Sequence, residues 1–237
     1  MTERGPAHVE AERVRAAYAR RAEQGADDRY GLTDPANLYL FQRRERALVE
    51  LLRRHELLPL TGRRILDVGC GNGAVLRDLQ RLGARPRDLA GVDLLAERVE
   101  AARAANPAIA VTQGDATRLP YRDASFDVAV LFTVVSSILD QAVRRVVASE
   151  AVRVVRPGGV IVWYDFTWNP GNRDTRGVGL AELRALFAGC DVDARRVTLA
   201  PPIGRRVARR SFTLAAALEA IPLLRTHYLA AITKPVP

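Results

Sequence analysis

Short apolar runs alternate with helical segments through the middle of the sequence, and this alternation restricts the fold more than any other feature. Each run has the length of a strand, and the segments between them repeat their apolar residues with the period of a helix. Strands separated by helices pair in parallel through right-handed crossovers. The pattern predicts a doubly wound α/β domain. We expect its strands at residues 64–68, 89–92, 108–112, 126–132 and 160–164, and its crossover helices at 74–82, 96–105 and 139–155.

Further elements are expected on both sides of this core. Two helices precede it, and a short helix and two strands follow it, so the sheet should have seven strands, mostly parallel. These elements are expected at residues 9–21, 37–57, 180–187, 192–199 and 226–233. Arg156-Pro157-Gly158-Gly159 is expected to end the helix before the fifth strand.

Between the last two strands, Pro201-Pro202 opens a segment that is expected to be a helical insertion. One helical face would carry arginines and the other would be apolar. The apolar face is predicted to consist of Ile203, Val207, Leu214, Leu218 and Ile221.

Length and composition fit one domain, since 237 residues and a hydrophobic share of 48% are ordinary for a globular chain. We divide it into an N-terminal helical lid or extension (1–60), a core (61–200), a cap (201–225) and a last strand with its tail (226–237). No apolar stretch is long enough to cross a bilayer of about 30 Å. Charges alternate through the N-terminus, where a secretory signal needs an apolar run, so a cytoplasmic protein is expected.

Cysteine, histidine and charge content exclude several classes of site. Cys70 and Cys190 are far apart and only three histidines occur, so neither a metal site nor a disulfide framework is expected. The net charge is +9, but arginine supplies all of the 36 basic residues except Lys234. This strong preference for arginine over lysine indicates a coding bias rather than a binding function. Nucleic acid is therefore a less favoured partner, but it is not excluded.

The segment Leu66-Asp67-Val68-Gly69-Cys70-Gly71-Asn72-Gly73 follows the first strand and opens a helix. Glycines in this position let a ligand approach the backbone closely, which predicts a nucleotide-like ligand. Asp93 ends the second strand about 20 residues after Gly71, where a carboxylate can accept hydrogen bonds from ribose hydroxyls. These features fit a dinucleotide as well as other nucleoside cofactors.

A third landmark, Gly114-Asp115-Ala116, follows the third strand, and a nicotinamide site does not require it. Together with Ser125-Phe126-Asp127 and Arg156-Pro157-Gly158-Gly159, it makes residues 65–165 resemble the class I S-adenosylmethionine-dependent methyltransferases. The resemblance is to their broad small-molecule group, the methyltransferase type 11-like proteins.

The resemblance implies S-adenosylmethionine as cofactor, S-adenosylhomocysteine as product, and a set of contacts for the bound cofactor. Asp67, Gly69, Cys70 and Gly71 would surround its methionine part, with Cys70 packing rather than reacting. Asp93 and the adjacent Leu94 would contact the ribose. Asp115 and Ala116 would contact the adenine, and Phe132 would border the sulfonium.

The methyl acceptor is predicted by exclusion. Phe132 to Ser137 lacks the Asn-Pro-Pro-aromatic run of enzymes that methylate exocyclic amines, and neither cysteine lies where cytosine C5 enzymes need one. Asp165, at the end of the fifth strand, is the first candidate base, and His227 is the second. Tyr18, Tyr30, Tyr39 and Phe41 suit an N-terminal lid. Candidate acceptor contacts are Tyr18, Tyr39, Ser136, Tyr164 and Asn169.

The expected reaction is methyl transfer to a small or medium-sized molecule, at an oxygen of a secondary metabolite or a glycan intermediate. Three alternatives stay open: carbon methylation of a prenylated quinone, methylation of RNA, and cofactor binding without chemistry. The sequence leaves a monomer and a homodimer equally open.

Overall fold

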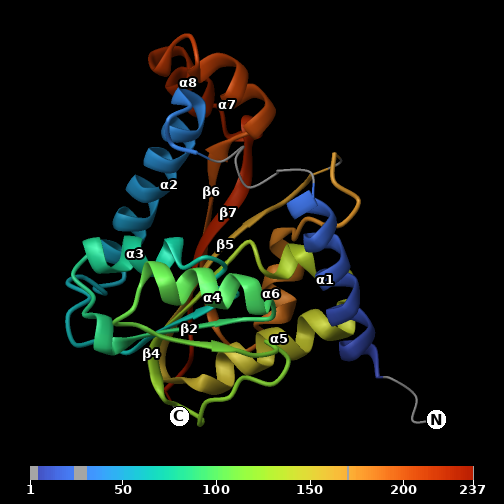
Figure 1. Ribbon diagram of the computed structural model, residues 1–237. Coiled ribbons are helices and arrows are strands. Elements are labelled where there is room, and N and C mark those ends of the chain that lie inside the picture. The colour runs from blue at the N-terminus through green and yellow to red at the C-terminus, as the bar shows by residue number, and fades with distance from the viewer. Residues whose placement is uncertain (1–4, 24–30, 170, 237) are drawn as a thin grey trace.

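The computed structural model describes residues 5–23, 31–169 and 171–236, and in them a seven-stranded sheet forms the centre of the molecule (Figure 1). The strand order is β3-β2-β1-β4-β5-β7-β6, and β7 runs in the opposite direction to the other six strands of this sheet. The predicted fold class is confirmed. The strands are β1 (Ile65–Val68), β2 (Leu89–Asp93), β3 (Ala110–Gln113), β4 (Phe126–Phe132), β5 (Val155–Phe166), β6 (Asp191–Leu199) and β7 (Arg225–Thr233).

Helices cover both faces of the sheet and extend it at one end (Figure 1). The α-helices are α1 (Pro6–Glu23), α2 (Pro35–Arg54), α3 (Ala74–Arg81), α4 (Ala96–Ala105), α5 (Gln141–Val154), α6 (Leu180–Leu186), α7 (Pro201–Ala208) and α8 (Phe212–Glu219). Short 3₁₀ turns are η2 (Pro86–Asp88), η3 (Val135–Ser137) and η4 (Pro222–Leu224).

Local sequence signals fix where several helices begin. Asp34 caps α2 by accepting a hydrogen bond from the Ala36 amide, and Pro35 occupies the first turn, where its missing N–H costs nothing. Asp140 caps α5 in the same way through the amide of Ala142.

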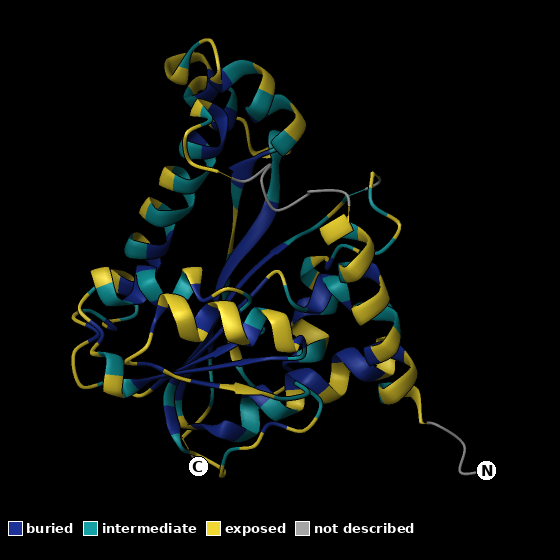
Figure 2. Ribbon diagram, viewed as in Figure 1, coloured by how far each residue is buried: buried dark blue, intermediate teal, exposed yellow. Residues whose placement is uncertain are grey.

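The strands at the centre of the molecule are buried (Figure 2), and their alternate residues fill two cores, one on each face of the sheet. On one face Ile65, Val128 and Val162 pack against leucines of α2 and α3. On the other face Leu66 and Trp163 pack among side chains of α5 and α6. The sheet is thus buried on both sides, and the carboxyl ends of its parallel strands are left to build a site.

The structure differs from the sequence prediction at Arg156-Pro157-Gly158-Gly159, which lies inside β5 rather than between helix and strand. Val155 already pairs with Phe126, and the register between β4 and β5 shifts after that pair. A side chain at Gly159 would lie 2.7 Å from the Asp127 carbonyl oxygen, so glycine is required there for the two strands to approach.

The insertion before β7 is helical as expected, but it is two short helices rather than one. Ser211 ends the first segment and caps α8 by accepting a hydrogen bond from the Leu214 amide. Ile203, Val207 and Leu218 pack in a third, small cluster with Tyr39. The predicted common apolar face is wrong for Leu214 and Ile221, because both side chains are exposed.

Candidate active site

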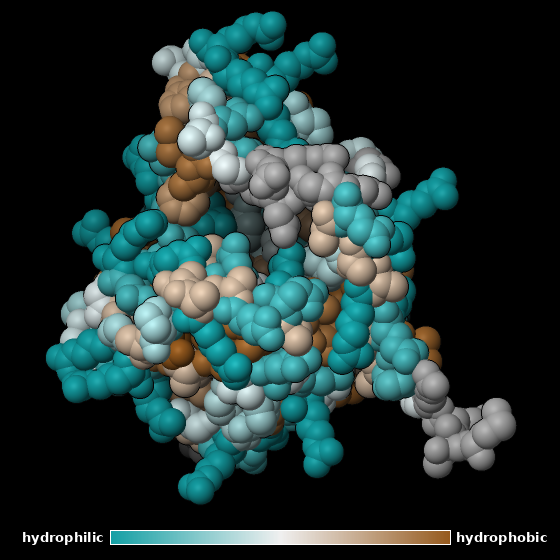
Figure 3. All heavy atoms as spheres, in the orientation of Figure 1, coloured by the Kyte–Doolittle hydropathy of each residue, from teal (hydrophilic) through white to brown (hydrophobic). Residues whose placement is uncertain are grey.

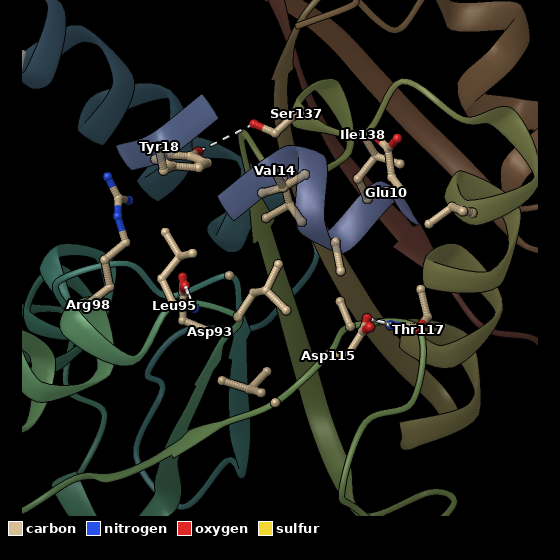
Figure 4. A pocket seen from close by; sticks show the side chains of 18 of the residues that line it. Glu10, Val14, Tyr18, Asp93, Leu95, Arg98, Asp115, Thr117, Ser137 and Ile138 are labelled. Carbon is tan, nitrogen blue, oxygen red and sulfur yellow. Dashed lines mark hydrogen bonds between the residues drawn. The ribbon is translucent and has the colours of Figure 1, made fainter. Parts of the chain in front are cut away.

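A cavity of about 140 Å³ lies at the carboxyl ends of β2 and β4, between the sheet and α1 (Figure 4). Residues from five neighbouring chain segments meet around it, as expected for a ligand site in an open α/β sheet. Of the site residues that the sequence predicts, the following line this cavity: Tyr18, Gly69, Asp93, Leu94, Asp115, Ala116 and Phe132.

The glycine-rich turn after β1 is held against β2. The amides of Gly69 and Cys70 both donate hydrogen bonds to the Val92 carbonyl. Gly69 has a φ of 71°, and a side chain there would lie 2.7 Å from Cγ2 of Val134. Glycine is therefore required at this position both for the backbone conformation and for the approach of the β4 loop.

Asp93 ties this turn to the start of α4. Its Oδ2 accepts a hydrogen bond from the Gly71 amide at 2.8 Å, and its Oδ1 accepts one from the Leu95 amide at 3.0 Å. A carboxylate has about four lone-pair sites, so two remain for ligand hydroxyls.

Asp67 is buried beneath the same turn, and its Oδ2 has no hydrogen-bond partner among the described residues. Burial, reinforced by the nearby Asp93, raises the pKa of this carboxyl well above its ordinary value. Burial likewise raises the pKa of the Cys70 thiol, so the thiol stays protonated. A packing role suits Cys70 better than a reactive one.

Asp115 follows β3 and faces the cavity with an oriented carboxylate. Its Oδ1 accepts hydrogen bonds from the amide and the hydroxyl of Thr117, both at 2.8 Å (Figure 4). No hydrogen bond to Oδ2 is found in the part of the chain that the structure describes. That oxygen can accept a hydrogen bond from a ligand amino group.

Helix α1 closes the cavity from outside. Ala7, Ala11, Val14 and Tyr18 line it, and their spacing of three and four residues places them on one helical face. The sequence prediction identified Tyr18 alone among them, although this spacing is visible in the sequence. Tyr18 also contacts Arg98, whose guanidinium carbon lies 4.3 Å from the centre of the ring.

Polar contacts hold α1 in this position. Glu10 is buried and accepts a hydrogen bond from the Leu139 amide at 2.5 Å, and Arg13 donates to Glu10 and to the Ser137 carbonyl. Hydrogen bonds from Arg13 and the Leu139 amide outweigh the effect of burial and lower the pKa of Glu10. The hydroxyl groups of Tyr18 and Ser137 are 3.4 Å apart.

Comparison with known families identifies the domain to which these residues belong. The family model "Methyltransferase domain" matches residues 66–163, which span β1 to β5 and include the glycine-rich turn, Asp93 and Asp115. Residues 66–163 form a class I S-adenosylmethionine-dependent methyltransferase domain. No helix among the described residues has the length and apolar character needed to cross a membrane.

Curated relatives and solved structures agree with this assignment. The chain is 35% identical over 159 residues to a probable S-adenosylmethionine-dependent methyltransferase of Mycolicibacterium smegmatis, covering 60% of this chain and 59% of that protein. It is 37% identical over 109 residues to a demethylmenaquinone methyltransferase of Beutenbergia cavernae, covering 46% of this chain and 43% of that protein. The chain thus spans about half the length of these relatives.

A solved structure shares the fold of the methyltransferase domain. The S-adenosylmethionine-dependent methyltransferase from Archaeoglobus fulgidus superposes with a TM-score of 0.58 at 18% identity, covering 83% of this chain and 98% of that one.

The residues around the cavity of this methyltransferase domain fit the family's cofactor. Asp93 and Asp115 offer acceptors for ribose hydroxyls and an adenine amino group, and Asp67 Oδ2 is a buried acceptor without a partner. Carboxylates also suit a ligand that carries a sulfonium and an ammonium group.

The two predicted bases do not lie at the cavity of the methyltransferase domain. Asp165 is buried and accepts hydrogen bonds from the amides of Ser136 and Phe166, both at 2.9 Å. Asp165 lies near the end of β5, as the sequence predicts, but its side chain turns to the backbone of η3. Asp165 is therefore better described as a residue that positions the β4–α5 loop.

His227 is also buried, and its ring stacks on Tyr164 with centroids 4.9 Å apart. Burial lowers the pKa of this imidazole to about 4, so it is neutral at pH 7 and a weak base. The Tyr164 hydroxyl pairs with Thr198 Oγ1 at 2.9 Å.

The remaining predicted acceptor contacts are also absent from the cavity lining. Tyr39 is buried in the third cluster and donates a hydrogen bond to Glu219, and Ser136 is buried in η3. Asn169 lies in the loop after β5, and Tyr30 lies outside the described residues. A lone aromatic or polar residue in the sequence does not reveal which side of its element meets the ligand.

Proposed function

We propose that the chain catalyses methyl transfer from S-adenosylmethionine to an oxygen of a small or medium-sized molecule, a secondary metabolite or a glycan intermediate. The supporting observation is that Asp93 and Asp115, at the ends of neighbouring strands, face one cavity beside the glycine-rich turn. We also propose that the chain acts in the cytoplasm.

The bound cofactor supplies a methyl group already activated by its attachment to a sulfonium. The chain has to hold the donor, align the acceptor and exclude water, and such positioning can lower a barrier by up to about 7–11 kcal/mol. Asp93 and Asp115 orient the cofactor, and α1 shields it from solvent. No base in the cavity is needed for an acceptor that is already nucleophilic.

An aromatic row supports the placement of the acceptor beside β4 and β5. Phe132 lines the cavity, its ring centroid is 5.4 Å from that of Tyr164, and Tyr164 stacks on His227. Of these rings Phe132 alone lines the cavity, with the buried Tyr164 and His227 packed behind it, and its face suits an apolar or ring-containing acceptor. The proposed acceptor therefore has an apolar part that packs near Phe132.

Carbon methylation of a prenylated quinone is a second candidate function. It is favoured by the same aromatic row and by the similarity to the demethylmenaquinone methyltransferase.

Transfer of labelled methyl from S-adenosylmethionine into a host-cell extract tests the proposal. Half of the extract is treated with RNase, and small molecules, lipids and polymers are separated. Label in a small-molecule product that survives RNase, and attached to oxygen by mass spectrometry, is expected. Label on carbon of an extractable quinone would support the second candidate. RNase-sensitive label in polymer would indicate an RNA methyltransferase, and absence of any product would leave cofactor binding without chemistry.

A further inference from the structure

Helix α8, at the end of the molecule far from β3, buries only one of its sides. Ala215 and Glu219 face inward, and Glu219 accepts hydrogen bonds from Tyr39 and Arg43. Leu214 lies on the exposed side of the helix, and Ile221 follows directly after the helix ends. These side chains are 53% and 46% exposed, and Leu223 in η4 is 83% exposed.

No ionised side chain interrupts this apolar stripe. Glu219 is the sole acidic residue between Pro201 and Arg225 in the sequence, and it is buried against α2. In Figure 3, hydrophobic atoms gather beside hydrophilic ones at the end of the molecule formed by α2, α7 and α8. An exposed apolar stripe of this kind marks an interaction surface.

Exposed arginines precede the stripe in the sequence, Arg206 within α7 and Arg210 just after it, and α7 packs against α8. Arg206 and Arg210 are exposed, and neither forms an ion pair within the described ranges, whereas Arg209 pairs with Asp34. The surface therefore combines aliphatic side chains with cations that can bind an external anion.

Charge decides between the possible occupants of this surface. A second copy docked stripe to stripe would bring its own arginines to the same interface, where like charges repel. A nucleic acid would use phosphates and aromatic faces for base stacking, but the sole aromatic residue between Pro201 and Arg225 is Phe212, whose ring packs edge-on against Tyr39. An anionic bilayer matches both parts, since lipid phosphates meet arginines and the acyl boundary accepts leucines.

We propose that the α7–α8 end docks on the surface of an anionic lipid bilayer. Leu214, Ile221 and Leu223 reach the boundary between headgroups and acyl chains, and Arg206 and Arg210 contact lipid phosphates. This docking goes beyond methyl transfer and does not depend on it.

Sedimentation of the whole chain with vesicles, without cofactor or acceptor, tests this surface. Vesicles of phosphatidylcholine alone are compared with vesicles containing phosphatidylglycerol. Binding is expected to be stronger to the anionic vesicles and to weaken with salt. Leu214→Ser with Leu223→Ser should lower the partition coefficient at least tenfold, and Arg206→Gln with Arg210→Gln should lower it about thirtyfold on anionic vesicles.

Control variants elsewhere on the surface distinguish docking through α8 from nonspecific adsorption to vesicles. Val146→Ser with Val236→Ser removes exposed apolar side chains outside α8, and Arg85→Gln with Arg87→Gln removes two exposed arginines near β2. Both pairs should leave vesicle binding unchanged.

Two results would overturn the proposal. One is vesicle binding that is absent, or that the leucine pair of substitutions leaves intact. The other is a dimer, found by sedimentation velocity without vesicles, that the same pair dissociates, because it would assign the stripe to a second copy. Neither result bears on methyl transfer, which the labelled-methyl experiment scores separately.

Discussion

Asp93 connects the two loops that form the centre of the site, since its oxygens accept hydrogen bonds from the amides of Gly71 and Leu95. Replacing it by alanine leaves these amides without their acceptor and removes the proposed ribose contact. Asp93→Ala should weaken S-adenosylmethionine binding by about 1–3 kcal/mol, the usual cost of an unmade buried hydrogen bond. Calorimetric titration measures this, with the exposed Glu100→Ala on α4 as control. A folded Asp93→Ala variant of unchanged affinity would refute the ribose role.

Asp165 makes stability depend on pH. Burial raises its pKa to about 6, against about 3.9 in an unfolded chain, so the native state binds this proton more tightly. Its contribution to the free energy of unfolding is therefore full below pH 4, falls as the pH rises to about 6, and stays lower above that.

Urea unfolding of wild type and Asp165→Asn at several pH values isolates this effect, because asparagine does not titrate. The stability advantage of the wild type should shrink by roughly 2 kcal/mol between pH 4 and pH 7. Asp191→Asn, at an exposed position, serves as control. A difference that is constant with pH would contradict the assignment.

The sequence predicts site residues well where their position relative to a strand end decides their direction. Asp93 and Asp115 are such residues, and both line the cavity. Asp165 also lies near the carboxyl end of a strand. However, β5 continues to Phe166, and the Asp165 carboxylate accepts a hydrogen bond from the backbone of η3 instead of facing the cavity. That contact depends on the conformation of a loop from another part of the chain, which no local pattern encodes.

Among the elements, α1 is the one whose role as a lid can be tested most directly. Arg13 bonds to Glu10 and to the Ser137 carbonyl, and this contact joins α1 to the loop after β4. Arg13→Ala should speed release of bound S-adenosylmethionine by about tenfold, since a charged hydrogen bond contributes about 1.5–3 kcal/mol.

Stopped-flow displacement measures this release rate. Arg15→Ala, which removes an exposed arginine from the same helix, should leave it unaltered. Equal release rates in wild type and Arg13→Ala would show that α1 is not a lid, and deletion of residues before Asn37 would then be without effect as well.

Element boundaries follow the sequence closely within the alternating core. The helix expected at residues 96–105 is α4, and the strand expected at 126–132 is β4. The insertion at 201–225 is less predictable because two short helices pack by tertiary contacts, so an apolar residue such as Leu214 points outward. Helix period alone does not tell which side of α8 meets α2.

At the scale of the whole molecule, the sheet brings together residues from α1 and from the ends of β1 to β4 around one cavity. The antiparallel β7 lies between β5 and β6, so the insertion α7–α8 projects at the end of the sheet near α2 (Figure 1). The sequence predicts the seven strands and the insertion. The position of α1 over the cavity depends on the hydrogen bonds of Glu10 and Arg13 to the loop after β4, and these contacts join segments that are far apart in the sequence.

S-adenosylmethionine is assigned to the cavity under α1, and calorimetric titration of the whole chain measures this binding without any acceptor. This assignment predicts saturable binding at one site per chain, competition by S-adenosylhomocysteine, and no competition by NAD. Absence of binding, or preferential binding of NAD, would contradict it.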